Sequence, residues 1–432
     1  MSSEGADSQA AAHRPRLVIV YDRHSLTPLE LAEAARPICD LIWVLDLADP
    51  LLGPLQPLIR RLGTVVDTTG LREADILERV GLTPPDGVIT FAERQLPLAA
   101  AIAAAFGLRF HSPATALLMS NKHDQRAALA DAGVPGPAFW PLAGDADMAA
   151  RERLADALRY PVVLKPQRGN ASRNTSLVHD RAELLRMVED PDGGPVDMLV
   201  EELLVEAHPR EQQRFGDTFM VDSVVEDGRA SHYALTRHFI PAPPFRGAGT
   251  FIPSDLEEPG AAQLIAATAA ALAALGVENG FTNTDLILTP DGPRVLEVNG
   301  RIGGEIHTLI ELAGGSPLLR EAMRFALGAP ASEVAQLPLD GVGFAINYHA
   351  PATARRLLAL DGLDAVAALA GVTRVVSHRQ VGDTLDWREG TMSRIFTAYG
   401  VTSDHDQLSE LHAQIYRSVA AGYDDVLNPS LS

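Results

Sequence analysis

Three side chains able to do chemistry stand at every second position in the stretch "RVLEVNGRIGGE": Glu297, Asn299 and Arg301. Side chains two apart in a β-strand point to the same face, so an acid, an amide and a guanidinium would lie side by side. Leu296 and Val298 would then face the other way, as in a half-buried strand. Carboxylate and amide oxygens suit a hard divalent cation, and an arginine beside them can hold an anion.

A second carboxylate is expected close to the first. The runs "TNTDLIL" and "RVLEVN" flank "TPDGP", whose Pro, Asp and Gly favour a tight turn, so they should form an antiparallel hairpin. If residues 288 and 294 close the turn, Asp285 lies opposite Glu297, with Cβ atoms ~5 Å apart, and like charges at that spacing are unfavourable. Mg²⁺ held by Asp285, Glu297 and Asn299 would offset the repulsion. The alternative is a surface hairpin with solvated acids.

The chain uses lysine at only two places, Lys122 and Lys165, among 36 Lys and Arg residues. Lysine places a compact point charge at the end of a thin stem, whereas arginine is a bulky planar fork. Two sites where only a point charge fits would explain their retention, and phosphate oxygens are a common target of such a charge. Chance retention is the alternative.

The elements that must position these residues fall into successive blocks. In the first, strands at 15–22, 40–47, 64–69 and 86–91 alternate with helices at 29–35, 73–80 and 97–106, which predicts an open parallel α/β sheet. No GxGxxG follows the first strand, so a dinucleotide site is not favoured there and a scaffold role is.

In the second block Ser120 is expected to cap a helix that runs to Asp131, which puts Lys122 in its first turn. The stretch 160–180 reads as strand, loop and strand, with Lys165 at the end of the first strand. Its loop "QRGNASRN" is either a phosphate-covering loop or an ordinary flexible hairpin. A hairpin turning at 227–228, a helix at 261–275 and a small β-rich unit after about residue 337 complete the expected elements.

Composition narrows the class of protein. A formal net charge of −20 argues against binding to nucleic acid or to anionic membranes. Cys39 is the single cysteine, which excludes a disulfide framework and favours the cytoplasm. The polar N-terminal stretch does not read as a signal peptide, and the longest apolar runs are too short and alanine-rich for membrane spans.

The ordered set "SNKHDQR", "PVVLKPQRGNASRN", "LVEELL", "TNTDLIL" and "LEVNGRIGGE" resembles the ATP-grasp superfamily, and within it the L-amino-acid ligase group of carboxylate–amine ligases. The resemblance implies an N-terminal open parallel α/β domain, a two-part ATP-grasp domain and a small C-terminal β-rich domain. Boundaries are expected at 1–119, 120–204 for the small lid subdomain, 205–335 for the large subdomain with the metal site, and 336–432. It also implies a possible homodimer.

The same resemblance implies a nucleotide site. Lys122 and Lys165 would contact the α- and β-phosphates of ATP, and the loop from Gly169 to Asn174, with Ser172, would fold over the triphosphate. Glu201 would accept a hydrogen bond from the adenine amino group. The adenine edge and the ribose would meet the following residues, for which the resemblance implies the backbone of Glu202 and Leu204 and either Glu206 or His208.

The reacting end follows in the same way. Asp285, Glu297 and Asn299 would hold Mg²⁺ or Mn²⁺, and Arg301 would stabilise the transferred phosphoryl group, with Lys165 and Arg237 as further catalytic candidates. Gly300 stands where similar ligases usually have proline. Glu305 occupies a position that lines the acyl-substrate pocket in such ligases, with Gly304 and His307 beside it. A solvated Glu305 is the alternative.

The chemistry implied is ATP-dependent amide formation from small carboxylate and amine substrates through an acylphosphate, giving ADP and phosphate. Phosphoryl transfer asks a protein mainly for positioning and charge neutralisation. Such ligases often serve specialised-metabolite synthesis, including peptide antibiotics. The rivals are another ATP-grasp reaction, such as carboxylation or a purine-pathway step, and a nucleotide-binding module without catalysis.

Overall fold

The computed structural model describes residues 14–22, 26–189, 196–334 and 339–425. The chain folds into two compact units, here called the N-terminal unit (Met1–Phe110 with Leu319–Pro330) and the main unit (His111–Leu318 with Ala331–Ser432). A short helical segment from late in the sequence thus belongs with the first 110 residues. The three boundaries expected between the four domains remain predictions, and the one between residues 335 and 336 lies outside the described residues.

The N-terminal unit contains the expected parallel sheet, with strand order β3-β2-β1-β4. Its central strands are continuous apolar runs, as strands buried on both faces require, and Leu17, Ile19 and Trp43 have no exposed surface. The strands are β1 (Arg16–Val20), β2 (Asp40–Leu45), β3 (Thr64–Asp67) and β4 (Gly87–Ile89). The helices are α1 (Pro28–Ala35), α2 (Gln56–Leu62), α3 (Glu73–Gly81), α4 (Leu96–Phe106) and, from the later segment, most of α11 (Leu318–Ala326).

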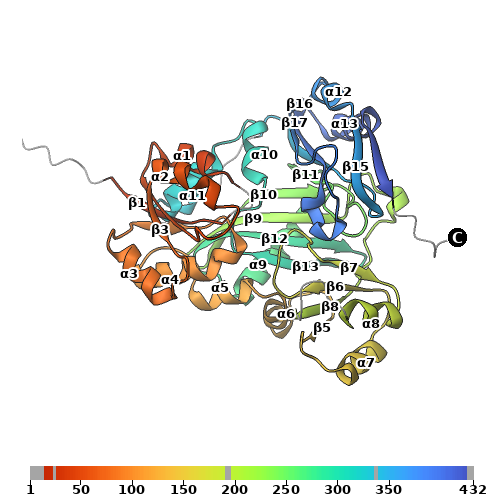
Figure 1. Ribbon diagram of the computed structural model, residues 1–432, viewed down its shortest axis with the longest axis horizontal. Coiled ribbons are helices and arrows are strands. Elements are labelled where there is room, and N and C mark those ends of the chain that lie inside the picture. Colours follow the sequence, from red (N-terminus) through yellow and green to blue (C-terminus); the bar gives the residue numbers. More distant parts are fainter. Residues whose placement is uncertain (1–13, 23–25, 190–195, 335–338, 426–432) are drawn as a thin grey trace, which may run out of the picture. The chain divides into compact units, whose positions relative to one another are not determined.

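The main unit begins with α5 (Pro113–Met119) and α6 (Lys122–Asp131), followed by a four-stranded antiparallel sheet of order β5-β8-β6-β7. Its elements are β5 (Phe139–Leu142), α7 (Met148–Ala157), β6 (Val162–Pro166), β7 (Ser176–Val178), α8 (Arg181–Glu189) and β8 (Met198–Glu202). Both helices lie on one side of this small sheet (Figure 1) and share its hydrophobic cluster, which includes Leu164 and Val200 of the strands and Leu184 of α8.

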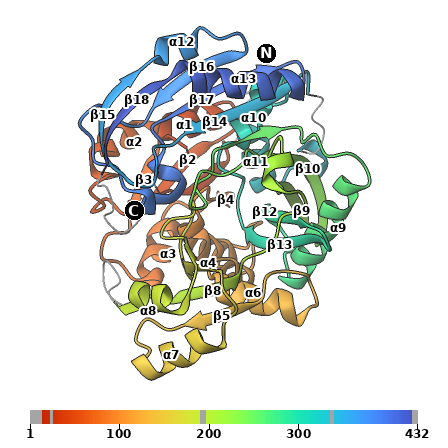
Figure 2. The same ribbon diagram turned by 90° about the vertical axis from the view of Figure 1, so that its right-hand side faces the viewer.

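A second sheet of eight antiparallel strands forms the centre of the main unit, in the order β13-β12-β9-β10-β11-β14-β17-β16. The strands are β9 (Thr218–Glu226), β10 (Arg229–His238), β11 (Gly249–Ile252), β12 (Gly280–Thr289), β13 (Gly292–Asn299), β14 (Val342–Tyr348), β16 (Val372–Ser377) and β17 (Phe396–Thr402). Around them are α9 (Gly260–Ala274), α10 (Ile306–Leu312), α12 (Leu363–Ala367), α13 (His405–Ser418) and a separate pair, β15 (Ala354–Asp361) and β18 (Ala420–Asp425). Figure 2 shows α9 beside β9, β12 and β13.

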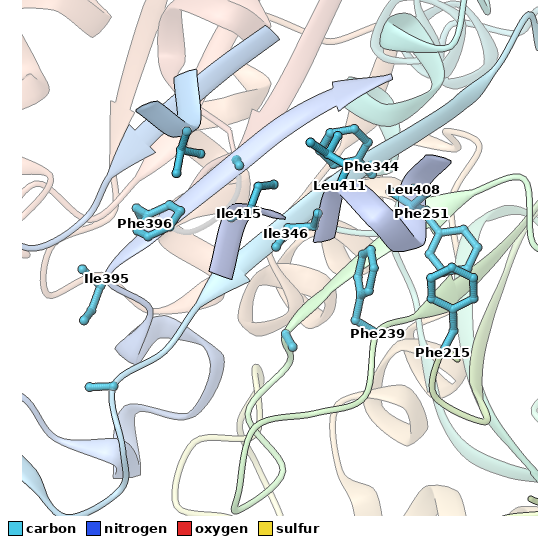
Figure 3. Close-up of a cluster of buried hydrophobic side chains, with 14 of the residues drawn as sticks. Phe215, Phe239, Phe251, Phe344, Ile346, Ile395, Phe396, Leu408, Leu411 and Ile415 are labelled. Carbon is cyan, nitrogen blue, oxygen red and sulfur yellow. The ribbon is translucent and has the colours of Figure 1, made fainter. Parts of the chain in front are cut away.

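The large sheet and its core continue across the position where a separate C-terminal domain was expected. The strand pair β11–β14 joins Phe251 to Phe344. One hydrophobic cluster holds Phe215, Phe239 and Phe251 together with side chains of β14, β17 and α13 (Figure 3). The C-terminal strands therefore extend the sheet that carries the candidate metal residues. The mixed α/β fold class expected from the sequence is confirmed.

Among the described residues, no helix combines the length and the apolar character needed to cross a membrane.

Candidate functional site

The hairpin of β12 and β13 brings Asp285 opposite Glu297 and Asn283 opposite Asn299, as the turn chemistry predicted. The expected turn closure was wrong by one residue, because Leu288 pairs with Pro293 rather than with position 294. A β-bulge restores the predicted pairing further along, since the register shifts between Asp285 and Leu286.

The bulge also changes which residues of β13 are buried. It falls at Leu296, so Val295 rather than Leu296 shares full burial with Val298. A bulge leaves an extra residue outside the ladder and locally re-aims the chain. Here the carbonyl oxygens of two consecutive residues, Val295 and Leu296, both accept hydrogen bonds from Arg126, the former at 2.8 Å.

Two side chains of helix α6 form hydrogen bonds with the edge strand β13. Gln125 donates from Nε2 to the carbonyl of Val298 at 2.8 Å and accepts from its N–H at 2.7 Å, as a neighbouring strand would. Arg126 adds its two carbonyl contacts. The helix begins one residue later than expected, because Asn121 rather than Ser120 is the N-cap, accepting from the N–H groups of residues 123 and 124. Lys122 nevertheless stands in the first turn, as predicted.

Both lysines point at carboxylates of this region. Lys122 Nζ lies 2.6 Å from Glu297 Oε1 and also donates to the carbonyl of Gly169 at 2.6 Å. Lys165 Nζ lies 2.7 Å from Glu201 Oε2, and Arg126 Nε donates to the other oxygen of Glu201 at 2.8 Å. The contacts form two ion-paired sets, and the two sets are near enough to interact, since Lys165 and Arg126 both help to lower the pKa of Glu297.

The pKa values of the two opposed carboxylates of the hairpin are shifted in opposite directions. Burial raises the pKa of Asp285 to about 7, and the charge of Glu297 adds to that rise. Burial also disfavours ionised Glu297, but Lys122 and then Lys165 outweigh it and lower the pKa of that carboxyl. The lysines thus compensate only one of the two acids. A divalent cation between them would favour the ionised form of Asp285, so these residues fit a bound metal.

The candidate metal set consists of two carboxylates and one amide. Asn299 donates from Nδ2 toward Asp285 Oδ2 and the carbonyl of Asn283, both at 3.4 Å, which leaves its oxygen out of these contacts. No group of three or more His, Cys, Asp or Glu side chains suited to a metal occurs in the part of the chain that the structure describes. Such a sparse protein ligand set is typical of Mg²⁺, which keeps waters and substrate phosphates as its other ligands.

The loop after β13 is anchored by Asp222, which lies beside Asn283 in the neighbouring strands. Its Oδ1 accepts from Asn283 Nδ2 at 3.0 Å and from the N–H of Gly303 at 3.2 Å. A Cβ at position 303 would stand 2.9 Å from that oxygen, so the close approach requires glycine. The anchor holds the segment that runs from Arg301 to Glu305, on which several predicted residues stand.

The predicted phosphate loop has an ordered, unusual backbone. Ala171, Ser172 and Asn174 have φ values of 55°, 55° and 53°, a left-handed conformation that non-glycine residues seldom adopt. The N–H of Asn174 donates to the carbonyl of Arg388 at 2.8 Å, and the N–H of Thr391 donates to that of Ala171 at 2.9 Å. The loop is therefore held against the C-terminal segment η5 (Trp387–Ser393), and Lys122 reaches its start at Gly169.

The residues expected at the adenine and ribose lie around the end of β8. Glu201 is buried and engaged by Lys165 and Arg126, whereas Glu202 is exposed and Leu204 is half-buried. His208 is exposed, and its Nδ1 lies 3.1 Å from Asp217, while Glu206 lies 3.0 Å from Gln213 Nε2. Their nucleotide contacts stay predictions.

Arg237 stands apart from the other candidates. Its guanidinium donates to Asp255 at 2.7 Å and lies 3.3 Å from Asp217. In the sheet register Arg237 aligns with Phe219 and Leu286, so its side chain leaves the face opposite to that of Asp285. The structure thus gives it other partners, and its catalytic role stays a prediction.

The predicted substrate residues stand at the end of the anchored loop and in the first turn of α10. Glu305 Oε1 accepts a hydrogen bond from the Tyr399 hydroxyl at 3.2 Å and lies 3.7 Å from Arg394 Nη2. His307 is buried in the first turn of α10, with Nε2 3.0 Å from the Thr308 hydroxyl. Gly304 has open space where a Cβ would stand.

Sequence reasoning missed the residues that reach the site from a distance. They are Gln125, Arg126, Asp222, Arg394 and Tyr399. Arg126 and Gln125 follow Lys122 at helical spacing, which was a usable signal that they share its side of α6. The others carried no comparable local signal.

Comparison with known proteins finds a domain family and several similar chains. Residues 119–305 match the model of the ATP-grasp domain. An uncharacterized protein of Sinorhizobium fredii, y4rH, is 28% identical over 68% of this chain, which spans 59% of that protein's length. The L-arginine-specific L-amino acid ligase of Bacillus subtilis is 22% identical, with 81% of this chain and 83% of that protein aligned.

Among solved structures, an L-amino acid ligase from Bacillus licheniformis superposes with a TM-score of 0.74 at 20% identity, covering 96% of this chain and 99% of that one. At this identity the likeness demonstrates a shared fold.

Proposed function

Because residues 119–305 match the ATP-grasp domain, we propose that the chain is an ADP-forming ligase that joins a small carboxylate to an amine through an acylphosphate. One of the two substrates is an amino acid or a similar compound. The observation that carries the proposal is the placement of Asp285 opposite Glu297, with Lys122 at 2.6 Å from Glu297 and Lys165 near enough to lower the pKa of that carboxyl. The named ligases among its relatives support the choice of an amine as second substrate.

In this proposal Asp285, Glu297 and Asn299 hold Mg²⁺, which would neutralise charge on the phosphates of ATP. Lys122 and Lys165 then turn from their carboxylates toward phosphate oxygens. The loop from Gly169 to Asn174 covers them, with the backbone N–H groups before Arg173 as donors, because those of Arg173 and Asn174 already donate to backbone carbonyls.

The substrate carboxylate attacks the γ-phosphorus, the bond from that phosphorus to the bridging oxygen breaks, and ADP leaves. Arg301 holds the transferred phosphoryl group. The amine then attacks the acyl carbon, phosphate leaves with the bonding electrons, and the amine gives up one proton. The protein's part is to position the reactants and to balance charge at each stage.

The proposal also includes the pathway, the location and the oligomeric state of the protein, which rest on the family resemblance and the composition. They are a role in specialised-metabolite synthesis such as that of peptide antibiotics, a cytoplasmic location and a homodimeric state.

The proposal is tested by incubating the full chain with Mg-ATP and a panel of carboxylic acids, with hydroxylamine present to trap an acylphosphate. Formation of a hydroxamate together with ADP and phosphate is the expected result for at least one class of acid. ADP release that depends on bicarbonate alone would instead favour a carboxylation reaction. Tight binding of ATP with no turnover on a panel that spans amino acids, hydroxy acids and fatty acids would contradict the proposal.

A further inference from the structure

A group of cationic side chains gathers around Glu305, which ends the anchored loop just before α10. Arg374 comes from β16, Arg394 precedes β17, and Tyr399 lies within β17. All belong to the main unit. Two arginines and one acid thus meet at the end of the loop that begins beside the candidate metal ligands.

The contacts inside this group, here called the Glu305 cluster, are loose. Tyr399 is 7% exposed and donates its hydroxyl to Glu305 at 3.2 Å. Arg374 is exposed and stacks on the Tyr399 ring, with its Cζ 4.6 Å from the ring centroid. Arg394 Nη2 lies 3.7 Å from Glu305, which is longer than a hydrogen bond.

Arg394 is poorly satisfied for a side chain that is only 14% exposed. Its Nε donates to His378 Nε2 at 3.0 Å, and its Nη1 meets the sulfur of Met392 at 3.6 Å. His378 is a neutral acceptor and not a counter-ion, and burial, Arg394 and Arg379 lower its pKa to about 4. A guanidinium offers five N–H donors, and a buried charge is costly unless it is paired and hydrogen-bonded.

Arg394 has fewer hydrogen-bond partners than Arg126. Arg126 is also buried, and its donors meet Glu201 and two backbone carbonyl oxygens. The only carboxylate that pairs with Arg394 among the described residues is Glu305, at 3.7 Å. A planar anion that accepts two parallel hydrogen bonds is the group that a guanidinium recognises best.

We propose that the Glu305 cluster is a subsite for a second, non-reacting carboxylate of the substrates. Arg394 receives it, Arg374 adds charge from the exposed side, and Glu305 accepts an ammonium group where the ligand carries one. The inference rests on the proposed ligase function and names its substrate class: an amine that bears a carboxylate, as an amino acid does, or an acyl donor with two carboxylates.

The chain geometry places this subsite within reach of the reaction. Glu305 follows Arg301 by four positions, and four steps along the chain span at most about 14 Å when fully extended. The anchor of Gly303 on Asp222 holds the middle of this loop in place. A small molecule can therefore react near Arg301 while a second charged group contacts the cluster.

The experiment compares carboxylate probes with their neutral amides. Binding to the full chain is measured by calorimetry with Mg²⁺ and a non-hydrolysable ATP analogue present. The amine arm uses L-alanine and L-alaninamide, and the acyl arm uses succinate and succinamate. The variants are Arg394→Gln, Arg394→Lys and, as the matched control, Arg417→Gln on the exposed last turn of α13.

In at least one arm, we expect the wild type and Arg417→Gln to bind the carboxylate more tightly than the amide. Arg394→Gln should remove that preference, a loss of about 10- to 100-fold, which is the worth of a charge-assisted hydrogen bond. Arg394→Lys should keep part of it. The arm that shows the preference identifies the substrate that carries the carboxylate.

The subsite would be refuted if neither arm prefers the carboxylate, or if Arg394→Gln keeps the preference. Binding of the ATP analogue and the thermal unfolding midpoint, measured for each variant, separate loss of the subsite from loss of fold. These titrations need no turnover. A hydroxamate assay that fails while the preference holds would remove the proposed function and leave an anion subsite, and the reverse result would remove the subsite alone.

Discussion

The charged side chains are tightly paired at one end of the candidate site and loosely paired at the other. At the end proposed to bind phosphate, here called the phosphate end, Lys122, Lys165 and Arg126 contact Glu297 and Glu201 at 2.6 to 2.8 Å. At the substrate end, the Glu305 cluster sets two arginines around one acid, with the ion pair to Arg394 at 3.7 Å. The same residue types are tightly paired in one place and loosely paired in the other.

The difference indicates what each end must do when ligands arrive. The cations at the phosphate end already hold partners, so the proposed function requires ATP and its metal to replace those partners. In that proposal a metal on Glu297 would release Lys122 for a phosphate. Internal pairing keeps three buried cations compatible with a stable fold before nucleotide binds. The substrate end has spare positive charge and gains from a ligand without losing an internal ion pair.

The largest expected effect comes from Glu297→Gln, which removes a proposed metal ligand and the partner of Lys122. Turnover should fall by at least about 10³-fold, because a metal contributes several kcal/mol of transition-state stabilisation. The measurement is ADP release over a range of Mg²⁺ concentrations, with Glu257→Gln on the exposed surface as control. Unchanged turnover would rule out the metal assignment.

A second substitution tests the two ends through stability. Glu201→Gln leaves Arg126 and Lys165 without a charged partner and should lower the free energy of unfolding by about 3–5 kcal/mol, the cost of breaking a buried pair. Glu305→Gln should cost less than about 1 kcal/mol, since its amide oxygen can still accept from Tyr399 and its ion pair is long. Urea unfolding measures both, and equal losses would contradict the comparison.

A third substitution tests the contact between segment η5 and the predicted phosphate loop. It is made at Gly390, which has φ 63° and lies against that loop. A Cβ there would stand 2.1 Å from the carbonyl oxygen of Ala171. Gly390→Ala should displace the loop and raise KM for ATP about tenfold, the equivalent of 1–2 kcal/mol. Gly382→Ala is the matched control, because Gly382 also has positive φ (102°) and its nearest atom, from Arg356, is 4.0 Å away.

The smallest effect is a pH dependence at the substrate end. Burial raises the pKa of Glu305, while Arg394, the Tyr399 hydrogen bond and Arg374 oppose the rise. As the pH is lowered toward this raised pKa, Glu305 gains a proton and the cluster becomes more positive. The preference for a carboxylate probe over its amide should therefore increase a few-fold on acidification in the calorimetric titrations.

Glu305→Gln should make that preference independent of pH. A preference that weakens on acidification in the wild type would show that Glu305 does not govern the charge of the cluster.

Residue spacing by itself determined the hairpin, the opposition of Asp285 and Glu297, the position of Lys122 in a first helical turn and the parallel N-terminal sheet, because each depends on neighbours within a few residues or on a regular alternation. It did not determine the bulge at Leu296, which compensates an error of one residue in the turn. The helix cap fell at Asn121 rather than Ser120, since two adjacent polar residues offer equal local signals.

Only the tertiary structure decided which distant side chains complete the site. Arg126 meets the carbonyl of Leu296 across 170 residues, and Tyr399 meets Glu305 across 94. No local pattern encodes such contacts, because they depend on how α6 and β17 pack in the folded main unit. The same packing made the C-terminal strands part of the large sheet and thereby placed Arg394 beside the end of the loop that Arg301 begins.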